Sequence, residues 1–195
     1  MQALPKNRKG QIYAIASELF SNRGYHATSM RDLAAQLGMQ GGSLYAHISS
    51  KEELLAEIVT QATEWFEQAL RPLMQTTHSP EEKLFEALKA HIEVIATHLD
   101  AAKVFFHEWQ HLGPEFYEKV ALRRDAVEKV YRNLIQEGIN QGAFRKDLDV
   151  KMATFLILSA ANWTYIWYRS NGCLNAEEIA RVYADMLLPG LKASR

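Results

Sequence analysis

The sequence predicts an all-α protein of about nine helices, and three observations support this prediction. Only 15 of the 195 residues are Gly or Pro, below the average of about 12%, which favours long helices over turn-rich β architectures. Apolar residues recur at intervals of three and four, and no segment of useful length alternates with a period of two. Capping residues stand where the periodic segments begin and end. With 48% hydrophobic residues the chain can also bury a core.

The first 50 residues predict three short helices. The apolar face of the first repeats at helical spacing: Ile12, Ile15, Ala16, Leu19 and Phe20. This helix should end at Gly24, which can adopt the left-handed conformation of a helix C-terminus. Ser29 and Asp32 have capping-box spacing and predict a second helix that ends at Gly38. A third helix is expected over about 40–47.

The same signals predict five further helices. Each begins at a capping residue or a first-turn proline and ends at Gly, before Pro, or where the apolar pattern stops. Their approximate bounds are 50–75, 79–113, 114–142, 149–172 and 175–188.

The helix predicted over 150–170 is apolar around most of its circumference. One face holds Met152, Phe155, Leu156, Ser159, Trp163, Ile166 and Trp167, and the opposite face holds Leu158, Ala161, Tyr165 and Tyr168. Such a helix must be covered on both sides, so we expect a second copy of the chain to pack on it about a two-fold axis. Its uncharged run, 152–168, counts 17 residues, short of the about 20 that a membrane span needs, and we expect no membrane association.

Charge is unevenly distributed along the chain. Residues 1–51 carry six basic and two acidic side chains, while the remainder carries 16 basic and 21 acidic ones. A basic N-terminal region favours contact with a polyanion, although chance scatter also gives an imbalance of this size. The single Cys cannot form an internal disulfide and no signal peptide is visible, which together indicate a cytoplasmic protein.

The predicted second and third helices have the proportions of a helix-turn-helix, in which the second of the two lies in the DNA major groove. Gly41 and Gly42 remove side chains from the start of the third helix, as a close approach to a phosphate or base edge would require. A flexible loop is the alternative explanation. The remaining side chains are mostly polar: Gln40, Ser43, Tyr45 and His47.

This region resembles the TetR family of bacterial transcriptional regulators over about residues 9–58. The matching motifs are Ala-x-x-Leu-Phe-x-x-x-Gly-Tyr at 16–25, Leu-Ala-x-x-Leu-Gly at 33–38, Gly-x-Leu-Tyr-x-His at 42–47 and Lys-Glu-x-Leu at 51–54. The resemblance implies a helix-turn-helix DNA-binding domain over 1–50 and a ligand-binding and dimerisation domain over 51–195.

The resemblance also implies a set of DNA-binding residues: Lys9, Thr28, Ser29, Gln40, Gly41, Gly42, Ser43, Tyr45, His47 and Lys51. Thr28 and Ser29 would donate to a phosphate from a helix N-terminus. Tyr45 and Lys51 would contact phosphates on either side of the groove, and His47 would lie near the backbone. Gln40 and Ser43 would contact base edges. The sequence departs from the family pattern at Met39, Ala46 and Ile48, and the two glycines leave few side chains to read bases.

A second motif, His107-Glu108-x-x-His111, has the spacing of a zinc hydrolase site, with two histidines one helical turn apart. The extended pattern fails, because Pro114 and Tyr117 occupy the positions of the expected Gly and third His. A catalytic zinc needs a third protein ligand. We therefore expect no metal, no cofactor and no catalytic residue, and keep a zinc-dependent hydrolase as a distant alternative.

Two stretches, 104–112 and 162–169, resemble the sensor domains of TetR-family regulators of fatty-acid, phenylacetate and sterol breakdown, which bind acyl-CoA thioesters. The implied ligand-binding residues are Phe105, Phe106, Trp109, Phe116, Arg123, Tyr131, Trp163 and Arg169. The aromatic side chains would line an apolar tunnel and the arginines would bind the CoA phosphates. The alternatives are an ordinary core and solvated surface charges.

The sequence is therefore interpreted as that of a ligand-responsive repressor, not an enzyme. It would bind an inverted-repeat operator in double-stranded DNA as a homodimer and be released by an acyl-CoA or aryl-acetyl-CoA. A repressor that senses a metal ion or a hydrophobic drug is the main alternative, because it differs only in the ligand.

Overall fold

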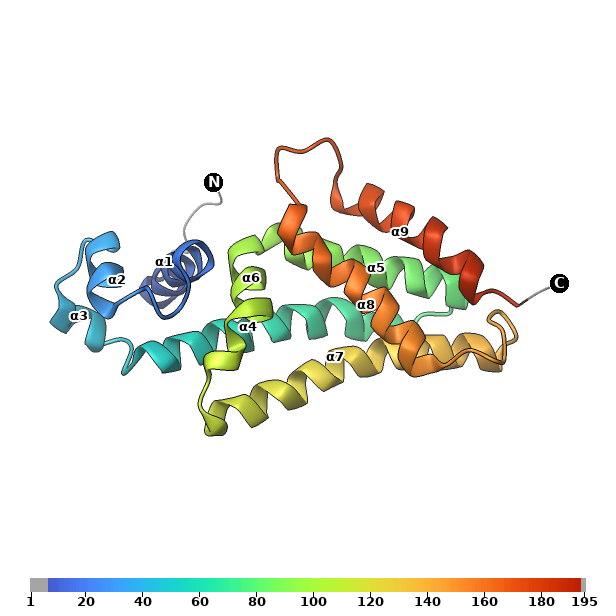
Figure 1. Ribbon diagram of the computed structural model, residues 1–195, viewed down its shortest axis with the longest axis horizontal. Helices are drawn as coiled ribbons and strands as arrows, with labels where there is room; N and C mark the ends of the chain where they lie inside the picture. Colours follow the sequence, from blue (N-terminus) through green and yellow to red (C-terminus); the bar gives the residue numbers. More distant parts are fainter. Residues whose placement is uncertain (1–6, 194–195) are drawn as a thin grey trace. The chain divides into compact units, whose positions relative to one another are not determined.

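The computed structural model describes residues 7–193 and is helical, with one isolated antiparallel β-bridge between Phe144 and Lys192 in the described part (Figure 1). Nine α-helices fall within these residues: α1 (Arg8–Arg23), α2 (Met30–Gln36), α3 (Gly41–Tyr45), α4 (Lys51–Leu70), α5 (Pro80–Thr97), α6 (Leu99–His107), α7 (Pro114–Asn140), α8 (Val150–Trp167) and α9 (Ala176–Leu191). Two 3-10 helices join them, η1 (Arg71–Gln75) and η2 (Trp109–His111). The predicted all-α class is confirmed.

The helix starts follow from local side-chain chemistry. Reciprocal capping boxes form at the N-termini of α2, α5 and α9, between the pairs Ser29 and Asp32, Ser79 and Glu82, and Asn175 and Glu178. Each box satisfies backbone N–H groups that have no partner inside the helix. Gly24 ends α1 with φ 86°, and Tyr25 folds back so that its ring lies 5.4 Å from that of Phe20.

Four predicted helix ends were wrong. The helix expected over 149–172 ends at Trp167, because the backbone of Tyr168 leaves the helical region with ψ 138°. The helix expected over 79–113 is divided at His98, whose backbone leaves the helical region while its ring stacks on Trp65, with ring centroids 3.6 Å apart. The helix expected over 50–75 tightens into η1 because Pro72 has no N–H to continue the α pattern. The last helix continues through Pro189 to Leu191. Pro189 has no N–H to donate to the carbonyl of Asp185, but Asp185 is exposed, so water can bond to that carbonyl instead.

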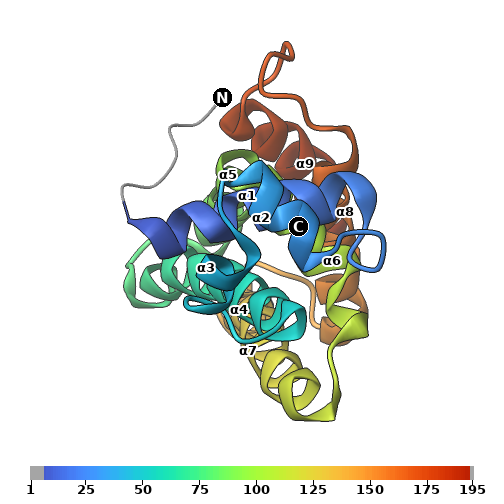
Figure 2. The ribbon, with the colours of Figure 1, turned by 90° about the vertical axis from the view of Figure 1, so that its left-hand side faces the viewer.

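The chain divides into two compact units. The first unit comprises the residues up to Thr63 together with Asp100–Ala121. It contains α1, α2 and α3, which face the viewer in Figure 2, and also α6 and η2. The three N-terminal helices pack on fully buried side chains: Ile12, Phe20, Leu33, Leu44 and Ile48. This unit is larger than the domain predicted over 1–50, because it continues to Thr63 and because Asp100–Ala121 joins it.

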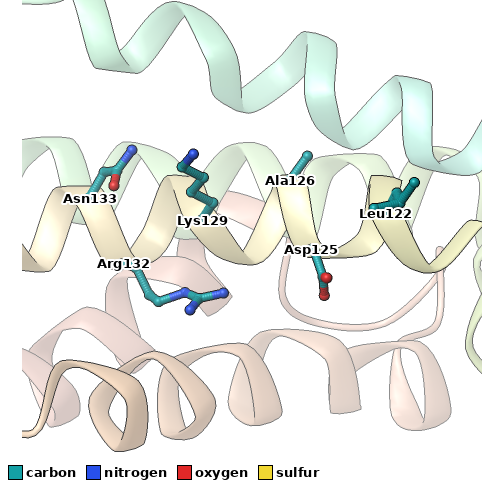
Figure 3. Close-up of a pocket in the computed structure, with 6 residues that line it drawn as sticks. All are labelled: Leu122, Asp125, Ala126, Lys129, Arg132 and Asn133. Atoms are coloured by element: carbon teal, nitrogen blue, oxygen red, sulfur yellow. The ribbon is translucent and has the colours of Figure 1, made fainter.

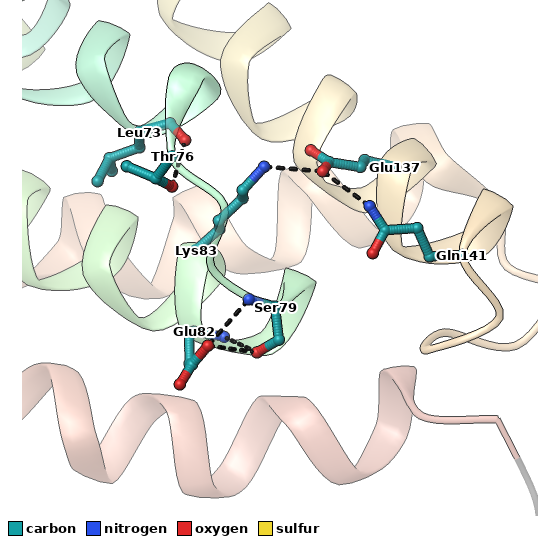
Figure 4. A network of polar contacts seen from close by, with 7 residues as sticks. All are labelled: Leu73, Thr76, Ser79, Glu82, Lys83, Glu137 and Gln141. Atoms are coloured by element: carbon teal, nitrogen blue, oxygen red, sulfur yellow. Dashed lines mark hydrogen bonds and ion pairs between the residues drawn. The ribbon is translucent and has the colours of Figure 1, made fainter.

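The second unit comprises Glu64–Leu99 and the chain from Leu122 onward. In it α5 packs against α8 and α9 (Figure 1). A partly buried ion pair joins α5 to α7, since Nζ of Lys83 donates to Oε1 of Glu137 over 2.7 Å and Gln141 donates to the same oxygen over 2.9 Å (Figure 4). The charge of this buried lysine is thus compensated, as burial requires.

One face of α8 and α9 is left uncovered within the chain. On α8 the face that holds Leu156 and Trp163 is exposed, with these side chains 59% and 60% accessible, while Ala161 and Tyr165 of the opposite face are buried. On α9 Met186 is 74% accessible. None of the described helices is both long and apolar enough to cross a membrane. Exposed apolar side chains in this number mark a contact surface.

Candidate functional site

Helix α3 presents an exposed polar surface. Only Leu44, with Ile48 just beyond the helix, is buried, and the predicted DNA-contact side chains Gln40, Ser43, Tyr45 and His47 are all exposed. Gln40 is the N-cap residue, yet its side chain makes no capping hydrogen bond. The side chain that the sequence assigns to base contact is therefore not used to hold the helix.

The two glycines of α3 are not required by packing within the chain. A Cβ atom at Gly41 or Gly42 would meet no heavy atom within 4 Å, and both residues have negative φ. Neither crowding nor backbone strain excludes a side chain there. Close approach of a DNA backbone remains the prediction that accounts for them.

Lys51 anchors the turn between α1 and α2. Its Nζ donates to the carbonyl oxygens of Tyr25 and Thr28, both over 2.9 Å, and lies 4.3 Å from the centre of the Tyr25 ring. An ammonium has three hydrogens, so one remains for the predicted phosphate contact. This anchoring role was missed by sequence reasoning.

The other predicted phosphate-binding residues differ in whether their side chains are already hydrogen-bonded within the protein. The hydroxyl of Thr28 is buried and donates to the carbonyls of Gly24 and Leu19, so a phosphate could reach it only if those bonds were exchanged. The Ser29 hydroxyl is occupied in its capping box. Lys9 is exposed, and its Nζ lies 5.5 Å from the centre of the Tyr13 ring. Lys9 is thus an accessible cation on α1.

The segment from α6 to η2 is bonded to the turn after α1 inside the first unit. Oε2 of Glu108 accepts from the backbone N–H of Tyr25 over 3.2 Å, and Nδ1 of His111 lies 3.1 Å from Nε2 of His26. The hydroxyl of Ser21 donates to Asp100 over 2.6 Å. Glu108 and His111 therefore join α6 and η2 to the three N-terminal helices.

The predicted helical His-x-x-x-His arrangement was wrong. His107 is the last residue of α6 and His111 lies in η2, because the helix ends between them. Among residues 7–193, no group of three or more His, Cys, Asp or Glu side chains is placed to hold a metal ion.

The predicted ligand-binding residues fall into both units. Phe105, Phe106, Trp109 and Phe116 belong to the first, and Arg123, Tyr131, Trp163 and Arg169 to the second. Within the second unit they do not converge. Tyr131 is fully buried and Trp163 is exposed. The guanidinium of Arg123 pairs with Glu64 over 3.1 Å, and that of Arg169 donates to the carbonyls of Ile166 and Tyr168. A ligand role for these eight residues stays a prediction.

An open groove of about 440 Å³ runs along α7 (Figure 3). Its lining is Leu122, Asp125, Ala126, Lys129, Arg132 and Asn133. Arg132 pairs with Glu128 over 3.0 Å. The groove is thus lined by side chains of both charge signs, Asp125 against Lys129 and Arg132.

The interior of the second unit contains a buried histidine that sequence reasoning missed. His91 on α5 is 2% accessible, and its Nε2 lies 2.9 Å from Oδ1 of Asn162 on α8. Burial lowers the pKa of His91 to about 4, so the ring is neutral near pH 7. The hydroxyl of Tyr131 on α7 donates to the carbonyl of Ala87, and burial raises the pKa of this phenol.

Comparison with known proteins gives matches over both parts of the chain. The family model for bacterial regulatory proteins of the tetR family matches residues 12–58, and that for the tetracyclin repressor-like C-terminal domain matches 77–191. The HTH-type transcriptional repressor KstR2 of Mycolicibacterium smegmatis is 30% identical over 194 residues, covering 98% of this chain and 94% of the relative.

Two solved structures are similar over nearly the whole chain. The ketosteroid transcriptional regulator KstR2 of Mycobacterium tuberculosis superposes with a TM-score of 0.91, at 29% identity and 97% coverage of each chain. AibR, solved in complex with isovaleryl coenzyme A and operator DNA, gives a TM-score of 0.84 at 28% identity, covering 94% of this chain and 99% of AibR.

Proposed function

Because the chain belongs to the tetR family of bacterial regulatory proteins, we propose that it is a transcriptional repressor that a CoA thioester releases from operator DNA. The similarity to AibR carries this proposal, since that structure holds both isovaleryl coenzyme A and operator DNA. The relatives from Mycolicibacterium smegmatis and Mycobacterium tuberculosis are named transcriptional repressors, which supports repression as the effect on transcription.

DNA binding in this proposal uses the exposed side chains of α3 in the major groove. Gln40 and Ser43 contact base edges, where Gln can bond bidentately to adenine. Tyr45 and the third hydrogen of the Lys51 ammonium contact phosphates. Because the turn held by Lys51 precedes α2, the same ammonium that faces DNA also fixes the position of the helix before α3.

A second copy of the chain covers the exposed apolar face of α8 and α9. Leu156, Trp163 and Met186, each at least 59% accessible, lose contact with water in such a dimer. A two-fold dimer carries two α3 helices, so its operator is an inverted repeat with half-sites about 34–36 Å apart or a multiple of that distance.

In this proposal the protein has two arrangements. The ligand binds one of them better and operator DNA binds the other better, so each partner shifts the equilibrium against the other. Helices α4 and α7 run without interruption from one compact unit into the other. Within the first unit, Glu108 and His111 tie the segment that follows α6 to the turn before α2. Through these elements a change of arrangement caused by the ligand can reach the DNA-binding helices.

The proposal contains no catalytic step and no resident cofactor; the thioester is an effector. Glu108, the acid of the hydrolase-like motif, already accepts the N–H of Tyr25 and lies 3.4 Å from His111. A protein that acts on operator DNA in this way works in the cytoplasm.

Operator binding measured by fluorescence anisotropy tests the proposal. The labelled fragment comes from DNA selected by the purified protein, and isovaleryl-CoA, longer acyl-CoAs and phenylacetyl-CoA are titrated into the complex. We expect at least one thioester to release the DNA at micromolar concentration, while the free acids and free CoA do not. Release by a metal ion or a cationic drug, with no effect of any thioester, would contradict the ligand assignment.

A further inference from the structure

His91 is a polar side chain at the meeting point of four helices in the second unit. Its ring lies 4.5 Å from that of Phe66 on α4 and 5.9 Å from that of Tyr131 on α7, and its Nε2 faces Asn162 on α8. All four residues belong to the same compact unit. Ligand sites of helical bundles are built between facing helices, with a few polar groups among apolar ones.

The partner of Nε2 assigns the proton to one ring nitrogen of His91. Oδ1 of Asn162 can only accept, so Nε2 of His91 donates and bears the hydrogen. Burial depresses the pKa of the ring to about 4, so a second proton is absent near neutral pH. Nδ1 is consequently a bare acceptor.

This acceptor has no partner. Nδ1 of His91 is one of three buried side-chain atoms in the described chain that make no hydrogen bond, and the only one on a residue that is itself fully buried. The nearest hydroxyl, that of Tyr131, already donates to Ala87. Two other buried polar residues of the unit are satisfied: Lys83 by Glu137 and Thr154 by the carbonyl of Val150.

An unsatisfied buried acceptor destabilises the fold, and phenylalanine at this position would avoid that cost while keeping the aromatic contacts. We propose that Nδ1 of His91 accepts a hydrogen bond from the effector, and that the effector presents an O–H or N–H donor to it. This inference rests on the proposed function, with a CoA thioester as the effector. The donor is either a hydroxyl on the acyl chain or an amide N–H of the pantetheine arm.

The burial of Nδ1 explains how this bond would act on DNA binding. In the structure described here the atom is sealed from solvent, so a ligand that bonds to it must bind another arrangement of α4, α5, α7 and α8. A ligand shifts an equilibrium only through such a difference in affinity between two arrangements. Because α4 and α7 continue into the first unit, an altered arrangement can reach the DNA-binding helices.

The test compares wild type with His91→Phe in the operator-release assay, using the matched pair 3-hydroxybutyryl-CoA and butyryl-CoA together with isovaleryl-CoA. The substitution should raise the thioester concentration that releases half of the operator DNA by roughly 10- to 100-fold, which is the size expected from losing one buried hydrogen bond. If the acyl hydroxyl is the donor, the loss applies to the hydroxylated thioester alone. If a pantetheine amide is the donor, all three lose equally.

Thr154→Val is the matched control, because Thr154 is another buried polar residue of the same unit and its hydroxyl is already bonded to the carbonyl of Val150. It should leave the thioester concentrations that release DNA unchanged, whereas His91→Phe should fold and melt no lower than wild type. If wild type responds to a thioester and His91→Phe responds identically, the inference is wrong and the proposed function stands. If no thioester releases wild type, the proposed function fails and the inference fails with it.

Wild-type protein with ¹⁵N-labelled imidazoles gives a readout that needs no substitution. One histidine should keep an unprotonated Nδ1 down to about pH 5, and that nitrogen resonance should move upfield when an active thioester is added. An unchanged resonance in the presence of a thioester that releases DNA would overturn the inference even if His91→Phe did not fold.

Discussion

Replacing Lys51 by methionine should loosen the turn between α1 and α2 while keeping an unbranched side chain that lacks only the ammonium group. The ammonium makes two hydrogen bonds of 2.9 Å to backbone carbonyls and lies over the ring of Tyr25. Each bond to a charged donor is worth about 1.5–3 kcal/mol, and the contact with the ring about 0.5–1 kcal/mol. Because Lys51 is half-buried and the freed carbonyls can be hydrated, we expect a net loss of about 2–3 kcal/mol.

Thermal unfolding of the intact protein measures this loss. For a chain of this length about 2–4 °C accompanies each kcal/mol, so the melting temperature should fall by about 4–12 °C. Lys119→Met is the matched control, since that lysine is exposed, with its Nζ 3.5 Å from the exposed Glu115 and 5.8 Å from the centre of the Phe116 ring; it should change stability by less than about 0.5 kcal/mol. Equal melting temperatures for the two variants would refute the anchoring role of Lys51.

The same variant tests the predicted phosphate contact. If the third hydrogen of the ammonium binds a phosphate, the slope of log K against log salt concentration should fall in magnitude by about one unit, with equal losses for all DNA sequences. A lower melting temperature with an unchanged salt slope would assign Lys51 to the protein turn alone.

Three further predictions concern packing and protonation. Trp163→Glu should convert the dimer to a monomer in light scattering and abolish operator binding, because it places a charge on the exposed face of α8; a stable dimer would exclude this face. Gly138→Ala should destabilise by about 1–2 kcal/mol in urea unfolding, since the added methyl would overlap the buried ring of Phe144; unchanged stability would show that the ring can move. His91 has its pKa lowered to about 4, so the unfolded chain binds the extra proton first. Stability should therefore fall as pH drops from about 6.5 to 4, by up to about 3 kcal/mol, and His91→Phe should lose this part of the dependence; identical pH profiles would contradict it.

The parts of the fold that depend on local chemistry were predictable from the sequence. The capping box of Ser29 and Asp32, the left-handed Gly24 and the exposed stripe of α8 are each set by residues close together in the chain. The break of the helix expected over 79–113 involves a distant partner. Nothing near His98 indicates that its ring stacks on Trp65, 33 positions away, and this contact accompanies the break that separates α5 from α6.

The candidate site was likewise predictable only where it depends on residues close together in the chain. The exposed side chains of α3 follow from a short motif, whereas the anchoring of Lys51 depends on the folded turn. Aromatic composition could not tell the buried Tyr131 from the exposed Trp163, because both are apolar residues on helical faces. A signal for His91 was available, since it shares the spacing of Leu84, Leu88 and Ile95 on the buried face of α5.

The reciprocity of ligand and DNA binding tests the central claim most directly. If a CoA thioester and operator DNA bind different arrangements of one protein, each must weaken the other by the same factor. Calorimetric titration of the thioester that releases DNA, into free protein and into the protein–operator complex, measures one side of this equality, and operator affinity with and without thioester measures the other. The account predicts equal factors, of order 10 or more. Thioester affinity that is unchanged by saturating operator DNA would contradict it.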